Sequence, residues 1–244
     1  MIAIPRDAAT LILMRDVARA KTGIEILLVR RHTQSAFMPG AYVFPGGAVE
    51  TADYTRQAER ICHGLSFEQA QEIIAGTSPP EKALGFYVAA IRETFEEAGI
   101  LLAYRDIPDV IAFSEDEKVR FTKYRSQGRK DPFSFATIIE REGLKLATEN
   151  IFYFAHWITP EVSSIRFDAR FFVSAAPSKQ EVLCDALETT DHVWISPQKA
   201  LKKQGVDFCI PPPTLSSITV LAQFSSVAEV IASAKDKDIP TGMG

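Results

Sequence analysis

The chain has 244 residues, of which 46% are hydrophobic and 24% are charged, and its formal net charge is −4. This length and apolar content suffice for one domain with a large core. The acidic balance argues against nucleic-acid binding, and no apolar run has the length of a membrane span, so we expect neither kind of partner. Three cysteines without metal-ligand spacing, and no signal-peptide pattern, predict reduced thiols in a cytoplasmic protein.

In chain order, the residue pattern predicts an alternation of strands and helices. Strands are expected at 9–17, 24–30, 100–103, 151–158, 170–175 and 192–195, and the end of a strand at 41–43. Helices are expected at 68–74, from Glu81 to Gly99, after Ser114, after Asp131 and beyond the run Pro211–Pro213. We assign residues 1–210 to one domain with a helical insertion at about 51–80, and residues 211–244 to a helical extension packed on that domain.

The helix expected before Gly99 carries an unusual set of acidic residues. Its apolar residues recur at spacings of four and three and form one stripe: Leu84, Val88, Ile91, Phe95 and Ala98. Three carboxylates, Glu93, Glu96 and Glu97, lie away from this stripe. They repel one another at these spacings, and the last two lie near the negative end of the helix dipole. Two interpretations remain open: a solvated outer face, or a group that binds a divalent cation.

Further upstream, Gly46 and Gly47 follow an apolar run that ends a strand. Paired glycines in such a place let a ligand or a metal approach the main chain closely. Together with the segment 92–100, this loop resembles the Nudix box, G-x5-E-x7-R-E-U-x-E-E-x-G-U, in which U is an aliphatic residue. The matching positions are Gly47, Arg92, Glu93, Glu96, Glu97, Gly99 and Ile100. The chain therefore resembles the Nudix hydrolases.

The first half of the box departs from the family pattern. The family box has 23 residues, whereas Gly47 to Ile100 spans 54 residues here, so 31 residues are inserted. Counting forward from Gly47, the first glutamate of the box falls on Asp53; counting back from Arg92, it falls on an apolar residue. Glu81, at the expected helix start, is a further candidate, and the choice between Asp53 and Glu81 stays open. A lid and a homodimer surface are two roles open to the insertion.

A long insertion after residues 44–47, Phe-Pro-Gly-Gly, resembles the Nudix subgroup that includes the peroxisomal coenzyme A diphosphatase with an interrupted box. Families that cleave coenzyme A have a second signature, L-L-T-x-R-[SA]-x3-R-x3-G-x3-F-P-G-G. Here residues 27–47 keep its spacing but have Val29, His32 and Ala36 at three of its positions. The resemblance implies coenzyme A or an acyl-CoA as substrate. It implies Arg30 and Arg31 as substrate-binding residues, although a solvated strand end would explain both arginines equally well.

The resemblance to Nudix hydrolases also implies a fold and a reaction. The fold is an α/β/α sandwich with a mixed β-sheet, and the reaction is metal-dependent hydrolysis of a diphosphate bond. Mg²⁺ or Mn²⁺ is expected as the cofactor, held by Glu93, Glu96 and Glu97 with the Gly46 carbonyl as a further ligand, because such hard cations prefer oxygen ligands. Glu93 is expected to be the base that activates water, and Arg92 its orienting partner.

Three further positions complete the expected site. Glu188, ahead of the strand at 192–195, lies where related enzymes often place another metal-binding carboxylate; a solvated loop acid is the alternative. Gly47 and Arg170 are expected to bind substrate, and for Arg170 a bond to a structural acid is equally open. Alternative substrates are ADP-ribose, a nucleotide sugar or NADH. A catalytically silent nucleotide sensor is a further alternative, which the intact glutamates disfavour.

Overall fold

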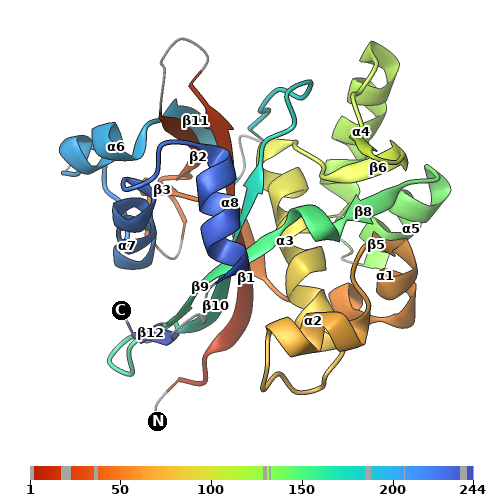
Figure 1. The fold of residues 1–244 in the computed structure, drawn as a ribbon, viewed down its shortest axis with the longest axis horizontal. Coiled ribbons are helices and arrows are strands. Elements are labelled where there is room, and N and C mark those ends of the chain that lie inside the picture. Colours follow the sequence, from red (N-terminus) through yellow and green to blue (C-terminus); the bar gives the residue numbers. More distant parts are fainter. Residues whose placement is uncertain are drawn as a thin grey trace.

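The computed structural model describes residues 3–17, 23–35, 38–128, 131, 133–184, 188–205, 207–236 and 241–243. A mixed β-sheet lies between two groups of helices (Figure 1). This arrangement confirms the predicted α/β sandwich. Within the described ranges, no helix is both long enough and apolar enough to cross a membrane.

The central sheet has eight strands, and its path runs in the order β11-β2-β1-β10-β9-β12. Strand β1 pairs antiparallel with β2 and parallel with β10, so the sheet is mixed as predicted. Two short strands lie off this path, β3 against β2 and β4 against β1. The strands of this sheet are β1 (Arg6–Asp16), β2 (Ile24–Arg31), β3 (Tyr42–Val43), β4 (Gly46–Ala48), β9 (Phe152–Ile158), β10 (Phe167–Ala175), β11 (Thr189–Ile195) and β12 (Thr241–Met243).

A second sheet has four short strands in the order β5-β8-β6-β7. They are β5 (Cys62–His63), β6 (Ala103–Asp106), β7 (Asp109–Val110) and β8 (Lys145–Ala147), and two 3-10 turns accompany them, η1 (Thr51–Tyr54) and η2 (Thr148–Asn150). The strand predicted at 100–103 is wrong in position, because β6 begins only at its last residue. The backbone of Leu101 is bonded instead to the side-chain amide of Gln180, which donates to its carbonyl and accepts from its N–H, both at 2.9 Å.

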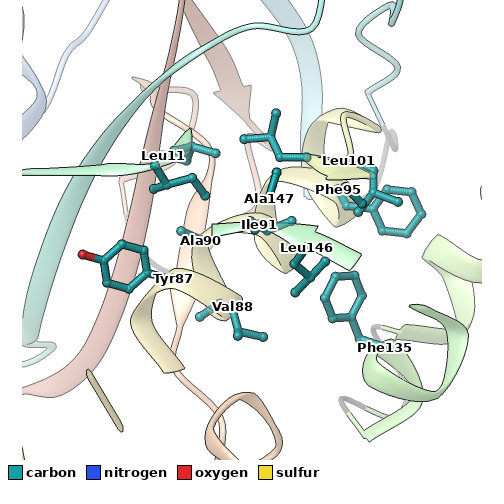
Figure 2. Packing of buried hydrophobic residues seen from close by; sticks show 14 of the residues in the cluster. Leu11, Tyr87, Val88, Ala90, Ile91, Phe95, Leu101, Phe135, Leu146 and Ala147 are labelled. Atoms are coloured by element: carbon teal, nitrogen blue, oxygen red, sulfur yellow. The ribbon is translucent and has the colours of Figure 1, made fainter. Parts of the chain in front are cut away.

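Helix α3 (Lys82–Ala98) carries the predicted carboxylates and ends at Gly99, which has a φ of 73°. Its apolar stripe is buried as predicted, and Figure 2 shows Ile91 and Phe95 of this helix packed among Leu11, Phe135 and Leu146 from other elements. The remaining sides of the helix are also almost entirely buried. These sides are covered because α3 contacts strands β1 and β4, the 3-10 turn η1, and helices α2 and α4.

The other helices divide between the two faces of the central sheet (Figure 1). Helices α1 (Arg56–Ile61), α2 (Phe67–Ile73), α4 (Glu115–Gly128) and α5 (Phe133–Arg141) lie on the side of α3, and α6 (Pro197–Lys203), α7 (Pro212–Leu221) and α8 (Val227–Lys235) lie on the opposite face. The helix predicted at 68–74 is confirmed as α2, which begins after Ser66 with a capping box to Gln69. The predicted helix start at Ser114 is confirmed by hydrogen bonds with Glu117. Of the predicted start at Asp131-Pro132, the proline lies outside the described residues.

The insertion expected at 51–80 is part of the core. It contains η1, α1, β5 and α2, and it contributes Ala58, Ile61, Ala70 and Ile74 to the apolar cluster around α3. On the opposite face, α7 and α8 bury Ile218, Leu221 and Val230 against the sheet. The domain boundary at residue 210 stays a prediction, but both segments take part in the packing of the main fold.

Candidate active site

The three carboxylates of α3 are buried. Glu96 and Glu97 expose 6% and 4% of their surface, and the side chain of Glu93 exposes 12%. The interpretation of this side of the helix as a solvated face is therefore wrong. Burying three acids within five residues is costly unless nearby groups compensate their charge.

The two glycines of strand β4 lie directly against these carboxylates. The N–H of Gly46 donates a hydrogen bond to Glu97 Oε2 at 3.1 Å. A Cβ atom on Gly47 would lie 2.5 Å from the carboxyl carbon of Glu93. Glycine is therefore required at position 47 for Glu93 to occupy its place beside the strand, as expected for a close approach to the main chain.

Arg92 holds the first half of the box to the second. Its Nε and Nη2 donate to the two carboxylate oxygens of Asp53 at 2.9 and 3.0 Å, and Nη2 also donates to the Ala48 carbonyl at 2.9 Å. Asp53 and Arg92 expose only 2% and 3% of their surface. Glu81 is exposed at the N-cap of α3. The structure thus places Asp53 against the box arginine and leaves Glu81 outside the site.

Arg92 also contacts the predicted metal ligands themselves. Its Nη1 donates to Glu93 Oε1 at 2.8 Å and reaches Glu96 Oε2 at 3.4 Å. Within the described part of the chain, no three His, Cys, Asp or Glu side chains already form a group that could hold a metal ion. Nη1 thus contacts one of the two oxygens of each of these carboxylates.

The electrostatics of the cluster favour a cation. Burial, together with the charges of Glu93 and Glu188, raises the pKa of Glu97 well above its usual value. Burial also raises the pKa of Glu93, against the opposing effect of Arg92. Arg92 is itself desolvated, but Asp53, Glu93 and Glu96 outweigh that effect and raise its pKa. A divalent cation would stabilise the ionised carboxylates, and their oxygens are the donors that Mg²⁺ and Mn²⁺ prefer.

A cavity of about 690 Å³ opens beside these groups. Its charged lining residues are Arg31, Glu50, Arg92, Glu93, Glu96, Glu97 and Glu188. Aromatic residues and prolines also line it, among them Trp157, Phe167, Phe171 and Pro211–Pro213. The volume and the mixture of apolar walls with a few charged groups are typical of a small-molecule site.

The structure brings most of the predicted site residues to this cavity. Gly46, Gly47, Arg31 and Glu188 all line it together with Arg92 and the α3 carboxylates. Their roles in metal or substrate binding stay predictions. The charge of Arg31 opposes part of the rise in the pKa of Glu97, so a positive group lies near the acidic cluster.

Arg30 and Arg170 do not line the cavity in the described structure. Successive side chains of a strand point to opposite faces, so Arg30 points away from the side to which Arg31 points. Its guanidinium lies 5.8 Å from the centre of the Tyr42 ring. The expected substrate contact of Arg30 is therefore not supported.

Arg170 lies on the face of β10 that packs toward α3. It is paired with Asp168, and its guanidinium lies 4.8 Å from the centre of the Phe86 ring. His156 also bonds Asp168, at 2.5 Å. Although desolvation opposes them, these two partners lower the pKa of Asp168. Of the two interpretations left open for Arg170, the bond to a structural acid is the one observed.

Several lining residues were absent from the predicted site. Phe167, Ala169 and Phe171 alternate with Asp168 and Arg170 along β10, and this period of two is the signal that could have identified a cavity face. The Pro211–Pro213 run, expected only to separate a helical tail, forms part of the wall. Nothing in its local sequence indicates that α7 folds back to this cavity.

The C-terminal end of α3 is fixed by three different segments. The carbonyl of Glu96 accepts from Arg125 Nη2 at 2.9 Å, and that of Glu97 accepts from Thr189 Oγ1 at 2.9 Å. The carbonyl of Ala98 accepts from the N–H of Leu183 at 2.8 Å. These bonds satisfy the helix carbonyls that have no intrahelical partner. They also hold the start of β11, and with it Glu188, beside the helix.

Comparison with known proteins agrees with the geometry of the box. A family model described as the NUDT19 Nudix domain matches residues 5–221. The chain is 28% identical to the acyl-coenzyme A diphosphatase NUDT19 of Xenopus laevis, covering 84% of this chain and 62% of that protein. It is 26% identical to the protein of the same name from Homo sapiens, covering 92% and 70% of the two chains.

A solved structure shows the same fold. The crystal structure of a Nudix hydrolase from Alicyclobacillus acidocaldarius superposes with a TM-score of 0.78 at 23% identity, covering 95% of this chain and 97% of that chain. The chain spans less than two thirds of the length of the Xenopus laevis and Gallus gallus relatives, at 62% and 65%. Since the family model covers residues 5–221, the chain belongs to the NUDT19 Nudix domain family of Nudix hydrolases.

Proposed function

We propose that this protein is a Nudix diphosphatase that hydrolyses the diphosphate bond of coenzyme A or an acyl-CoA. The observation that carries the proposal is the buried set of Glu93, Glu96 and Glu97 beneath the Gly46–Gly47 strand, at one side of a 690 Å³ cavity. The curated relatives bear the name acyl-coenzyme A diphosphatase, which supports this substrate class. The products would be a 4'-phosphopantetheine derivative and adenosine 3',5'-bisphosphate.

We further propose Mg²⁺ or Mn²⁺ as the cofactor, held by Glu93, Glu96 and Glu97. Glu188 and the Gly46 carbonyl are candidate additional ligands. When bound, the cation neutralises charge on the diphosphate oxygens, which otherwise repel a nucleophile. Arg92 Nη1 bonds one oxygen of Glu93, so this carboxylate could hold the cation and keep its bond to Arg92, whose guanidinium Asp53 holds in place.

The chain's own residues would then perform the hydrolysis. Glu93 accepts the proton of the attacking water as the water oxygen forms its bond to phosphorus and the diphosphate P–O bond breaks. Arg92 orients Glu93, and Arg31, which lines the same cavity, would bind the anionic diphosphate. A homodimer and a cytoplasmic location stay predictions from the sequence.

A substrate panel tests the proposal directly. The protein is incubated with Mg²⁺ or Mn²⁺ and with coenzyme A, octanoyl-CoA, ADP-ribose, NADH or a nucleotide sugar, and the products are separated by chromatography. We expect turnover of the coenzyme A compounds. Turnover of ADP-ribose, NADH or a nucleotide sugar without turnover of coenzyme A compounds would show that the proposed substrate class is wrong. If none of these compounds is turned over, the proposed enzymatic activity is wrong and the alternative is a nucleotide sensor.

The metal assignment is tested by Glu97→Gln. The neutral amide should lower turnover by about 100-fold or more, because a buried metal ligand loses its charge. The melting temperature without metal should change little, since burial raises the pKa of Glu97 and so disfavours its charged form. Glu72→Gln, at an exposed position of α2, serves as the matched control and should keep full activity. Wild-type turnover by Glu97→Gln would refute the assignment.

A further inference from the structure

The apolar side of the cavity is a built surface distinct from the carboxylates. It combines Trp157 of β9, Phe167 and Phe171 of β10 and the start of α7 at Pro211–Pro213. We call these residues the aromatic–proline wall. Trp157 packs against the apolar cluster beneath α7 and α8, and Phe171 belongs to that cluster, so the wall is anchored by the core of this face.

The start of α7 is chemically unusual for a helix that borders a nucleotide site. A helix N-terminus normally offers free N–H groups to a phosphate. Here the N-cap and the two residues that follow it are prolines, which have no N–H. This end of the helix therefore presents ring carbons to the cavity at positions where other helices present hydrogen-bond donors.

The positive charges of the cavity do not lie on this wall. Among the described lining residues, the cationic side chains are Arg31 and Arg92. Arg92 is bonded to Asp53 and Glu93, and the charge of Arg31 acts on Glu97. An additional phosphate group would therefore find no positive partner among the described residues of the aromatic–proline wall.

We propose that the aromatic–proline wall binds the pantetheine–acyl arm of the substrate, and that the adenosine bisphosphate half lies elsewhere. This inference rests on the proposed coenzyme A substrate. Beyond the diphosphate, the acyl arm carries no charge and ends in a hydrocarbon chain, which gains by leaving water for an apolar surface. The adenosine half carries an additional 3'-phosphate, which this wall cannot neutralise. Trp157 is then a residue that determines specificity for the acyl group.

The test separates the two halves of the substrate by using the two products as ligands. Binding of octanoyl-4'-phosphopantetheine and of adenosine 3',5'-bisphosphate to the full chain is measured by calorimetry in the presence of Mg²⁺. Trp157→Ala should weaken binding of the octanoyl compound by about tenfold or more, as expected when an apolar contact is removed. Binding of adenosine 3',5'-bisphosphate should change less than about twofold. Trp157→Phe should restore most of the lost affinity.

Two further variants keep the test decisive. Pro212→Ser changes an exposed position at the first turn of α7, where serine is compatible with the helix, and it should also selectively weaken binding of the octanoyl compound. Val162→Ala, whose side chain is 95% exposed in the β9–β10 connection, should change neither affinity. Melting temperatures establish that each variant is folded.

The outcomes distinguish this inference from the proposed function. Selective weakening of adenosine 3',5'-bisphosphate would show that the wall stacks the adenine base and would overturn the inference, while coenzyme A turnover by the wild type would leave the proposed function standing. Unchanged affinity for both products in Trp157→Ala and Pro212→Ser would also overturn it. Failure of the wild type to cleave coenzyme A or octanoyl-CoA would instead refute the proposed function on which the inference rests.

Discussion

At the scale of single residues, the site depends on two glycines that leave room for carboxylates and on the ion pairs of one buried arginine. Gly47 leaves room for the Glu93 carboxylate, and Gly46 donates its N–H to Glu97. Arg92 is bonded to Asp53 on one side and to Glu93 on the other. Apart from the Arg92–Glu93 bond within α3, these contacts join the first half of the box to its helical half. Substitutions at these positions should therefore show which contacts are needed for turnover and which for the stability of the fold.

Gly47→Ala is expected to lower turnover by about 100-fold, because the added methyl group would displace Glu93 from its position. The atoms in the way belong to the end of a flexible side chain, so the melting temperature should fall only slightly. Steady-state kinetics and thermal unfolding measure the two effects. Gly205→Ala, where the nearest atom lies at 3.7 Å, is the control for adding a methyl group and should behave as the wild type. Normal turnover by Gly47→Ala would show that Glu93 can work from another position.

Asp53→Asn is expected to destabilise the protein by about 3 kcal/mol, since it removes the charge that compensates the buried Arg92. Urea unfolding measures this free energy. Glu81→Gln changes the other candidate for the first box glutamate, at an exposed position, and should stay within about 0.5 kcal/mol of the wild type. A larger effect at position 81 than at position 53 would reverse the assignment made from the structure.

At the scale of elements, α3 is the organising helix. Its N-terminal half is covered by the insertion, where Tyr54 lies so close to Gly85 that a Cβ there would be 2.9 Å from it. Its C-terminal half carries the carboxylates and is held by bonds from α4, β11 and the segment around Leu183. The insertion thus supports the helix that carries the site, and it does not line the cavity in the described structure.

The bond from Thr189 to the Glu97 carbonyl gives a test at this scale. Thr189→Val keeps the shape of the side chain but leaves the buried carbonyl without this donor, which should cost about 1–3 kcal/mol. Because Thr189 also positions Glu188, the Mg²⁺ concentration for half-maximal activity should rise. Thr189→Ser should restore both values. A loss of stability in Thr189→Val with an unchanged Mg²⁺ requirement would limit Thr189 to a structural role.

At the scale of the whole molecule, two apolar clusters share the central sheet. One surrounds α3 and includes residues of the insertion, and the other lies beneath α6, α7 and α8. The C-terminal helices thus form a face of the fold and a wall of the cavity. Their burial implies that the chain unfolds as one cooperative unit.

Ile218→Ala tests whether the C-terminal helices unfold together with the rest of the protein. Ile218 has no exposed surface in α7, so its truncation should destabilise the whole protein by about 2–5 kcal/mol while denaturant unfolding keeps a single transition. Thr219→Ala, at the exposed neighbouring position, should shift the free energy of unfolding by less than about 0.5 kcal/mol. Two separate transitions in Ile218→Ala, with activity lost in only one of them, would mean that the C-terminal helices fold as an independent unit.

The parts of the fold that the sequence predicts well are those with strong local signals. The capping box at Ser114, the cap at Gly99 and the apolar stripe of α3 each depend on residues within a few positions of one another. The sequence does not predict strands β4, β5, β7, β8 and β12, because they have only two or three residues each, and it places the glycines of β4 in a loop. Such short strands are defined by the strand with which they pair, and the local periodicity of the sequence does not identify that partner strand.

The sequence by itself determined the helix that carries Glu93, Glu96 and Glu97 and its end at Gly99, because those features follow from spacing along the chain. Only the tertiary structure decided that Asp53 and not Glu81 meets Arg92, that Arg31 and not Arg30 lines the cavity, and that the proline run forms a wall. The physical reason is that these contacts join residues far apart in the sequence. Arg92 and Asp53 are 39 positions apart, and Gly46 and Glu97 are 51 positions apart. Contacts at such distances depend on how the sheets and helices pack, which the local pattern of residues does not specify.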